Sequence, residues 1–299
     1  MAGGQERVLR RRIRSVQSTK KITKAMELIA ASQIVRAQNR MAANRPYRHG
    51  MARIVVEAAR ADPQAAAKLL GTPDDPRRVG VLAVVADRGL SGPYNSSVLR
   101  ATERLLAELA AAGREVRLFT VGKKAQSYFR FRHQAVERAF VGVSERPSFD
   151  DARTLADAVA APFAAGEIDQ LLLVATHYQS AGSQAVETRQ LLPLPDPRGT
   201  EGVEEEVRTG YTEFEPDVEK LLSELTAMAV ESEVFTALLE GAASFFTAQQ
   251  RAMAAATDNA DELIRTLSRI MNRARQDAIT TEIMEIVGGA EALRQSKGA

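Results

Sequence analysis

The chain has 299 residues, enough for about two domains, and its 45% hydrophobic but only 5% aromatic composition indicates an Ala- and Leu-rich helical protein with a real core. It has no cysteine, which excludes disulfides and thiolate metal sites and fits a reducing compartment. The N-terminus is Arg-rich without the apolar block of a signal peptide, and the longest apolar stretch, within residues 79–86, is too short to span a bilayer. Any work at a membrane is therefore expected to go through partners.

The formal net charge of +2 hides a strong separation of charge along the chain. Residues 1–56 contain thirteen Lys and Arg against two Glu, whereas residues 201–240 contain twelve acids against Arg208 and Lys220. The two blocks are expected to lie alongside each other, with Arg40, Arg45, Arg48 and Arg53 near the acids. Two other readings stay open at this point: each block is a solvated face, or the basic one binds nucleic acid or acidic protein loops.

Residues 5–59 read as helix almost throughout. Apolar residues recur at helical spacing in groups that include Leu9 and Ile13, then Ile22 and Ile29, then Ile34. The register shifts between these groups predict stutters that locally relax a supercoil without ending the helix. Pro46 removes a backbone donor, so we expect a kink near Asn44 or Arg45.

After a Pro- and Gly-containing linker at residues 61–78, the pattern changes to short strands alternating with helices. Such alternation predicts βαβ units and a mostly parallel sheet. The predicted strands are 79–86, 116–121, 136–141, 171–176 and 184–194, the predicted helices are 95–112, 123–131 and 150–165, and 195–210 is predicted to be a loop.

The last third of the chain predicts one long helix from near Pro216 to Val287, about 105 Å long. Alternating steps of four and three residues from Leu221 to Ala274, through positions such as Ala256, Leu263 and Ile270, trace an apolar seam that needs a partner helix. The predicted domains are therefore a helix at 1–60, the linker at 61–78, an inserted Rossmann-like α/β domain at 79–210, and a helix at 211–299. The two terminal helices are expected to pair as a long antiparallel coiled coil, with an apolar tip around Ile279–Val287 projecting past its partner as an interaction site.

Catalytic chemistry has little support in the sequence. The three histidines, His49, His133 and His177, lie far apart and match no metal spacing. The loop Gly89-Leu90-Ser91-Gly92 joins a strand to a helix, but it lacks the Lys-Ser/Thr ending of a phosphate loop and the dinucleotide glycine pattern. We therefore interpret it as a tight turn, and no catalytic residue, metal or cofactor is predicted.

Motifs at both termini resemble a known family. Residues 12–32 (RIRSVQSTKKITKAMELIAAS) resemble the opening of the gamma-subunit family of F-type ATP synthases, and residues 255–260 (AATDNA), 272–276 (NRARQ), 279–283 (ITTEI) and 285–290 (EIVGGA) resemble its closing signature. Internal stretches at 87–90 with Asn95, 190–194 and 214–217 are also similar. The sequence departs from the family pattern at Gln33, Met271, residues 226–230 and Phe245-Phe246.

The resemblance implies a non-catalytic central rotor shaft that couples proton-driven rotation of a c ring to ATP synthesis and hydrolysis on beta subunits. Alpha, beta, epsilon and c subunits would be its partners, at the cytoplasmic face of the bacterial plasma membrane, which the chain would meet only through the c ring. By the same resemblance, beta-subunit contacts fall on Arg275, Gln276, Thr280, Lys20, Lys21, Lys24 and Met26, and c-ring contacts fall on Thr212, Phe214 and Glu215.

Two other classes of function are weighed against this one. A nucleotide-binding α/β enzyme with helical arms would bind a nucleotide tightly as an isolated chain. A nucleic-acid-binding coiled coil would use the basic first 56 residues and would lose affinity steeply with salt. Because no aromatic residues are interleaved with those basic residues, stacking on bases is disfavoured and no nucleic-acid partner is expected.

Overall fold

The computed structural model describes residues 2–61, 70, 75–195 and 218–297. It divides into two compact units, one made of residues 30–249 and the other of residues 1–29 with 250–299. Two long helices, α1 (Ala2–Ala61) and α6 (Val218–Lys297), each contribute to both units. The predicted domain boundary at 210/211 lies outside the described residues, and the predicted division into four segments stays a prediction.

The larger unit contains a five-stranded sheet with the order β3-β2-β1-β4-β5. β1 (Arg78–Val84), β2 (Glu115–Val121), β3 (Arg138–Phe140) and β4 (Gln170–Tyr178) are parallel, and β5 (Gln184–Leu192) pairs antiparallel with β4 at one edge. The helices between the strands are α3 (Tyr94–Ala111), α4 (Lys123–Phe131) and α5 (Phe149–Ala164). The predicted α/β class with a mostly parallel sheet is confirmed.

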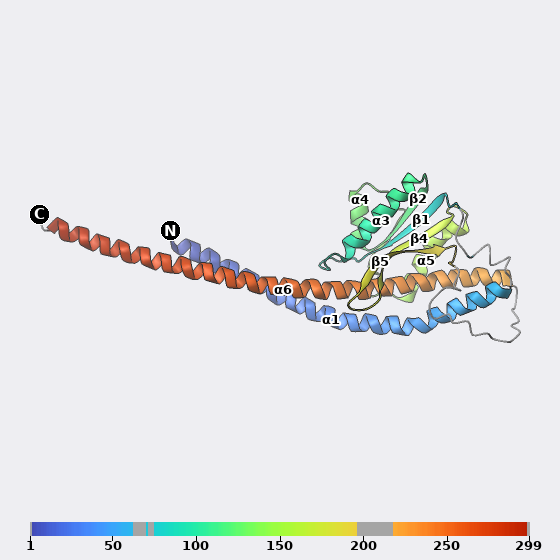
Figure 1. The fold of residues 1–299 in the computed structure, drawn as a ribbon, viewed down its shortest axis with the longest axis horizontal. Coiled ribbons are helices and arrows are strands. Elements are labelled where there is room, and N and C mark those ends of the chain that lie inside the picture. The colour runs from blue at the N-terminus through green and yellow to red at the C-terminus, as the bar shows by residue number, and fades with distance from the viewer. Residues whose placement is uncertain (1, 62–69, 71–74, 196–217, 298–299) are drawn as a thin grey trace. The chain divides into compact units, whose positions relative to one another are not determined.

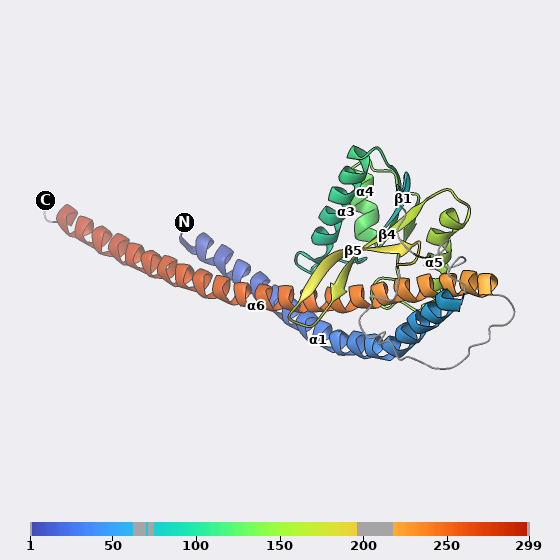
Figure 2. The same cartoon turned by 45° about the vertical axis from the view of Figure 1, so that its right-hand side comes forward.

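The sheet is covered on both faces, as the continuous apolar run of β1 predicts. Alternate residues of a strand point to opposite faces. Val79, Val81 and Ala83 pack with α3 and α4 in one hydrophobic cluster. Leu82 and Val84 belong to the opposite cluster, which contains residues of α5, α1 and α6. Figure 2 shows β1 and β4 lying between α3 and α4 on one side and α5 on the other.

In the larger unit, α1 and α6 run antiparallel. The Arg48 guanidinium donates to both carboxylate oxygens of Glu233, at 2.6 and 3.2 Å, and the Asn44 amide donates to the Thr236 hydroxyl at 2.9 Å. The predicted pairing of Arg48 with the acids of α6 is therefore confirmed, whereas Arg40 donates to the carbonyl oxygen of Pro147 instead. The helix α1 continues through Pro46.

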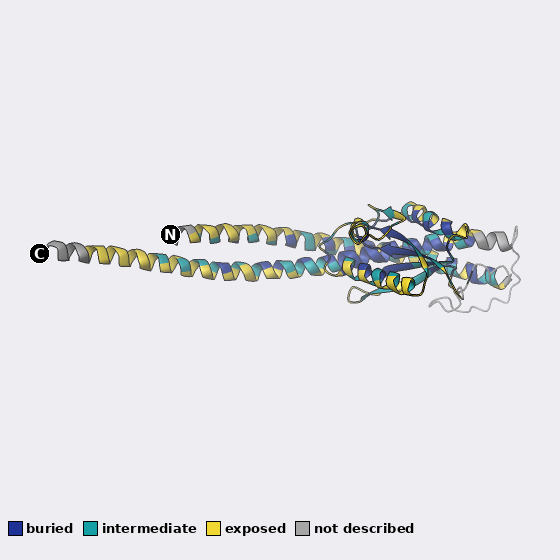
Figure 3. Cartoon of the chain, turned by 90° about the horizontal axis from the view of Figure 1, so that it is seen from above, coloured by how far each residue is buried: buried dark blue, intermediate teal, exposed yellow. Residues whose placement is uncertain are grey.

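Burial along α6 changes sharply, as Figure 3 shows by colour. Residues 236–247 are buried on every side because α1 and the α/β domain cover them together, whereas all residues from 279 to 290 are exposed. A helix that is apolar all round is a core helix, and one with a narrow stripe needs only one partner. The helix α6 is therefore part of the domain core at residues 236–247 and one helix of a coiled coil at residues 250–274.

In the smaller unit, the two helices also pair antiparallel. The Lys20 ammonium lies 2.5 Å from Asp261 Oδ1, and the Thr23 and Thr257 hydroxyls are 2.8 Å apart. Among residues 250–290 of α6, the buried ones are Met253, Thr257, Ala260 and Leu267. The predicted seam is right at Met253, Ala260 and Leu267 but wrong at Leu263 and Ile270, whose exposed fractions are 42% and 46%. In the larger unit it is also wrong at Met228, which is 41% exposed. Ile264 and Met271 are half-buried in their places.

The predicted stutters in α1 are also wrong. The buried and half-buried positions keep an unbroken alternation of four and three steps that runs through Ile13, Val16, Lys20, Thr23, Glu27 and Ala30. Ile22 and Ile29, which were predicted to lie in a shifted seam, are 60% and 58% exposed. The seam keeps one register because polar residues are tolerated in it. Lys20 pairs with Asp261 across the interface and Thr23 with Thr257, so these polar groups have hydrogen-bond partners.

The threonine pair gives the first prediction. Thr23→Val and Thr257→Val should each destabilise the helix pair by about 1 kcal/mol, because each removes one partner of a buried hydrogen bond. The double variant should cost less than the two single variants together, because the hydrogen bond between the two hydroxyls is then lost only once. In each single variant the remaining hydroxyl keeps only a carbonyl of its own helix, that of Lys20 for Thr23 or that of Met253 for Thr257. A denaturant-unfolding double-mutant cycle followed by helical circular dichroism measures this coupling. Thr19→Val, at an exposed position of the same helix, is the control, and strict additivity would contradict the pairing.

Candidate functional site

The predicted contact residues Arg275, Gln276 and Thr280 lie on α6 and are all exposed. Extending the antiparallel register from the Lys20–Asp261 pair places Ala2, eighteen residues before Lys20, opposite Ile279, eighteen residues after Asp261. Arg275 and Gln276 therefore lie beside the first turns of α1, and Thr280 lies where that helix begins. In Figure 1, the C-terminal end of α6 extends beyond the N-terminus of α1.

Beyond that point α6 has an exposed apolar face. Its exposed large hydrophobic residues are Ile279, Ile283, Met284, Ile286 and Val287, between 49% and 68% exposed. Apolar residues gathered on one stretch of surface usually mark an interaction site. The prediction of an exposed apolar tip is confirmed by these values.

The predicted contact residues on α1 are in different environments. The Lys20 ammonium is used in the ion pair with Asp261, and the Lys24 ammonium lies 3.0 Å from Glu27 on its own helix. Lys21 is exposed and Met26 is half-buried. Lys20 therefore lies at the interface between the helices, whereas Lys21 and Lys24 are exposed.

Two exposed apolar residues near these lysines were missed as contact candidates. Ile22 and Leu28 are 60% and 61% exposed on α1, next to Lys21 and Lys24. Apolar periodicity alone predicts Ile22 in the seam, because it does not allow a threonine such as Thr23 at the interface. The signal was present in the regular recurrence of Ile13, Thr23, Ala30 and Ala37 along one stripe. The remaining predicted contacts, Thr212, Phe214 and Glu215, lie outside the described residues.

The α/β domain places its own side chains where sheets of this type bind ligands. The strand order reverses between β1 and β4, and ligands of doubly wound folds bind at that reversal, beyond the carboxyl ends of the strands. Here Tyr94, Phe245 and Phe246 pack with Ala86 and with Ile34 of α1 in one buried cluster. The Tyr94 and Phe245 rings meet edge to face at 5.8 Å, and burial raises the pKa of the Tyr94 phenol.

The helix α6 closes this position tightly. A Cβ added to Gly241 would lie 3.2 Å from the Tyr94 hydroxyl oxygen and 3.8 Å from the Val84 side chain, so the α6 backbone passes close to the end of β1. The end of β4 is covered as well, since the Gln38 amide of α1 donates to the Tyr178 hydroxyl at 2.7 Å. The crevice in which a dinucleotide would lie is filled by the protein itself.

The loop after β1 is held by its own polar side chains. Asn95 accepts a hydrogen bond from the Ala86 N–H and donates to the Arg88 carbonyl. Asp87 accepts hydrogen bonds from the backbone N–H groups of Lys123 and Gly142 and from the Ser144 hydroxyl. These three hydrogen bonds connect the segments that follow β1, β2 and β3. The interpretation of this loop as a tight turn agrees with the left-handed φ of +63° at Leu90.

Asp87 gives a prediction on acid stability. Burial alone would raise the pKa of its carboxyl, but the hydrogen bonds from Gly142, Ser144 and Lys123 outweigh burial and lower the pKa below its usual value of 3.8. A lowered carboxyl pKa stabilises the fold above the unfolded value, and that contribution disappears as pH falls through the folded pKa. Asp87→Asn should therefore unfold at lower temperature at neutral pH, and the difference from wild type should shrink below about pH 4. Calorimetric melting temperatures across pH test this, with the exposed Asp157→Asn as control; a difference that persists unchanged in acid would contradict it.

A third prediction concerns nucleotides. Because Tyr94, Phe245 and Gly241 fill the switch point, titration of the purified chain with ATP and with NAD should release no heat of specific binding. Isothermal titration calorimetry at protein concentrations of tens of micromolar measures this. Micromolar affinity for either ligand would contradict this prediction and support the alternative hypothesis of a nucleotide-binding enzyme.

Comparisons with known proteins place the chain in a family. The family model described as ATP synthase matches residues 5–293. The ATP synthase gamma chain of Frankia casuarinae is 48% identical over 297 residues, covering 97% of this chain and 98% of its relative, and that of Kineococcus radiotolerans is 45% identical over 297 residues, covering 98% of both chains. A chain in the cryo-EM structure of the Euglena gracilis mitochondrial ATP synthase (OSCP/F1/c-ring) has the same fold, with a TM-score of 0.67 at 18% identity over 99% of this chain and 97% of that chain. The chain therefore belongs to the ATP synthase gamma chain family.

Proposed function

We propose that this chain is the central rotor shaft of an F-type ATP synthase, coupling rotation of a proton-driven c ring to ATP synthesis and hydrolysis on beta subunits. The observation that carries the proposal is the end of α6, which extends past α1 with an exposed apolar face and the exposed Arg275, Gln276 and Thr280 beside it. A gamma-family chain with such an end has a surface suited to the inside of a surrounding ring of subunits.

The proposed partners follow from the family. Alpha and beta subunits would surround the α1–α6 pair, and the epsilon subunit and the c ring would meet the α/β domain together with Thr212, Phe214 and Glu215. The complex would be peripheral, at the cytoplasmic face of the bacterial plasma membrane. Among the described residues, no helix is long and apolar enough to cross a membrane.

The proposed role requires that the α1–α6 pair present different residues on its different sides. In the smaller unit, α1 presents Ile22, Leu28 and the cation Lys21, while α6 presents Arg275, Gln276 and the apolar residues that follow. When such a pair turns inside a threefold ring, each beta subunit meets a different face in turn. Contacts that favour one beta conformation over another then shift its population, which is how rotation drives the nucleotide sites through their states.

Catalysis in this proposal belongs to the beta subunits. The filled switch point between β1 and β4 supports a structural role for the α/β domain, and the buried cluster of Tyr94 and Phe245 supports a fixed joint between the sheet and α6. A rotor gains from such a joint because rotation applied to the domain has to reach the helix pair without slip.

The decisive experiment is affinity purification of the tagged chain from solubilised membranes. Alpha, beta, epsilon and c subunits should be recovered with it in the proportions of a rotary ATP synthase, and the purified complex should hydrolyse ATP. A matched preparation in which the last nineteen residues, 281–299, are deleted tests whether the exposed apolar end contributes to assembly. Recovery of the full-length chain without alpha and beta subunits would overturn the proposal.

A further inference from the structure

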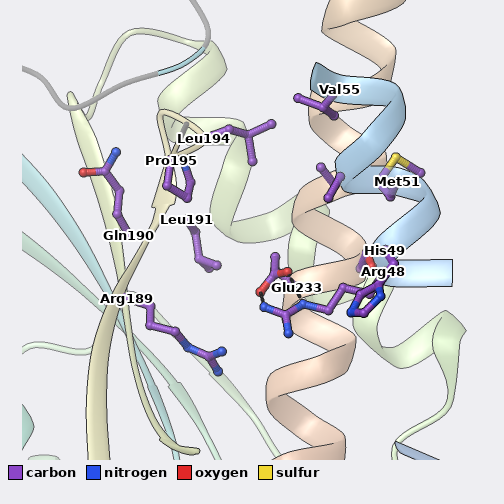
Figure 4. A pocket seen from close by; sticks show the side chains of 13 residues that line it. Arg48, His49, Met51, Val55, Arg189, Gln190, Leu191, Leu194, Pro195 and Glu233 are labelled. Carbon is purple, nitrogen blue, oxygen red and sulfur yellow. Dashed lines mark hydrogen bonds and ion pairs between the residues drawn. The ribbon is translucent and has the colours of Figure 1, made fainter. Parts of the chain in front are cut away.

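A cavity of about 340 Å³ lies within the larger unit, between α1, α6 and the end of β5. Figure 4 shows its walls: Arg48, His49, Met51 and Val55 come from α1, Glu233 comes from α6, and Arg189, Gln190 and Leu191 come from β5, with Leu194 and Pro195 just after it. Cavities of this size hold small organic molecules in other proteins. The proposed rotor function assigns no role to this cavity.

One end of the cavity is apolar. Its lining side chains there are Met51, Val55, Leu191, Leu194 and Ala229, and each is less than 9% exposed. Surfaces of this kind favour an apolar body, since each methylene of a ligand that is buried there leaves water.

The other end is polar, and its arginines are each paired with a carboxylate. Arg48, Arg189 and Glu233 line it. Glu233 is already bound by Arg48 through two hydrogen bonds, and Arg189 donates one hydrogen bond, from Nη2, to the buried Glu240 at 3.1 Å. A guanidinium carries five N–H donors in a planar fork, so Arg189 keeps donors for an acceptor placed in the cavity.

Two further observations indicate that this end suits a hydrogen-bonding ligand. The Ser232 hydroxyl, on a residue that is 2% exposed and lines the cavity, has no hydrogen-bond partner among the described residues. Burial would lower the pKa of Arg48, but the charge and hydrogen bond of Glu233 outweigh burial and raise it, so the guanidinium stays charged in a partly dry site. Buried polar groups without partners are uncommon and often mark the position of an acceptor or water.

We propose that this cavity binds a small carboxylate with an apolar body, its head group held by Arg189 and Ser232 and its body against Met51, Val55 and Leu191. A cation is disfavoured because the carboxylates of Glu233 and Glu240 are already matched by arginines. Since the ligand would touch α1, α6 and β5 together, its binding stabilises the junction of the helix pair with the sheet.

The test is isothermal titration calorimetry of the full chain with decanoate, and with 1-decanol as the same body without the charge. Decanoate should bind saturably, at least about tenfold more tightly than decanol, because a charge-assisted hydrogen bond contributes more than the 1.4 kcal/mol that a factor of ten requires. Ala52→Phe, which places a ring in the cavity, should abolish decanoate binding, whereas Ala43→Phe, on an exposed position of the same helix, should leave it unchanged. The double variant Arg189→Gln, Glu240→Gln removes both members of the buried pair together, and it should lower decanoate affinity about tenfold without weakening decanol.

A direct measurement keeps the test valid if Ala52→Phe does not fold. In a chain carrying methyl-labelled methionine, decanoate should shift the NMR signal of Met51, assigned with Met51→Leu, and leave that of the exposed Met228 in place. No saturable binding of decanoate, equal binding by the Ala52→Phe variant, or a Met51 signal that does not move would overturn the proposal. Equal affinity for decanol would overturn the assignment of a carboxylate head group.

Discussion

An Arg275→Ala, Gln276→Ala double variant should form the complete ATP synthase complex and hydrolyse ATP severalfold more slowly than the wild type. Both residues are exposed on α6 at the stretch where α1 begins, so their loss removes no contact of the buried seam that ends near Leu267. The guanidinium fork suits a carboxylate and the neighbouring amide both donates and accepts, which makes the pair a suitable contact for one beta subunit.

The contact has to be modest in strength. Every hydrogen bond formed in one rotational state is broken before the next, so an overly strong contact would itself slow rotation. A charge-assisted hydrogen bond of about 1.5–3 kcal/mol is strong enough to favour one state and weak enough to be released. Its loss therefore slows turnover severalfold and does not abolish it.

The measurement is the steady-state ATPase rate of the purified complex beside its subunit stoichiometry. Arg265→Ala, Thr266→Ala is the matched control, because these residues are also exposed and adjacent on the same helix. Unchanged turnover in the Arg275→Ala, Gln276→Ala variant would contradict the proposed contact of these residues with a beta subunit. Failure of the complex to assemble would show that the two residues have a structural role.

Most elements of the α/β domain were predictable from sequence because each carries a local signal. The helix 123–131 was predicted with the bounds that α4 has, since Gly122 and the turn at Arg132 end the periodic stretch on both sides. β1 was predicted within about two residues, because a β-branched apolar run bounded by Arg78 and Asp87 fits only a strand buried on both faces.

The register of the coiled coil was less predictable. Leu263 is followed by Ile264, and Ile270 by Met271, so the sequence offers two apolar alternations that differ by one residue. Only the partner helix decides between them, and it places a threonine, Thr257, in the seam opposite Thr23. The ion pair between Lys20 and Asp261 joins residues 241 positions apart, and no local pattern indicates such a pair.

The ligand cavity also depends on tertiary structure alone. Its lining residues come from α1, the end of β5 and α6, and in sequence each resembles an ordinary core or surface residue. The exposed residues Arg275, Gln276 and Thr280 were selected through the family resemblance, and the structure adds their exposure and their position at the start of α1.

Gly122→Ala should strongly destabilise the α/β domain. Gly122 lies between β2 and α4 with a φ of +94° and a ψ of 139°, a conformation that side chains rarely adopt. A Cβ at this position would lie 2.4 Å from the Val85 carbonyl oxygen and 2.8 Å from that of Ala86, and both belong to the backbone at the end of β1. Neither oxygen can move freely, since the Ala86 oxygen accepts a hydrogen bond from the Lys124 N–H and the Val85 N–H donates to Val121.

Gly113→Ala separates the two causes of this effect. Gly113 also has a positive φ, of +72°, but an added Cβ there meets nothing within 4 Å. Gly113→Ala should therefore cost only the backbone strain, about 1 kcal/mol, whereas Gly122→Ala adds a steric overlap and should lower the free energy of unfolding by about 3 kcal/mol or more. Differential scanning calorimetry should show a melting temperature lowered by about 6–12 °C for Gly122→Ala and by a few degrees for Gly113→Ala. Equal losses in the two variants would show that the backbone after β1 moves to make room for the added carbon, in spite of the hydrogen bonds of Val85 and Lys124.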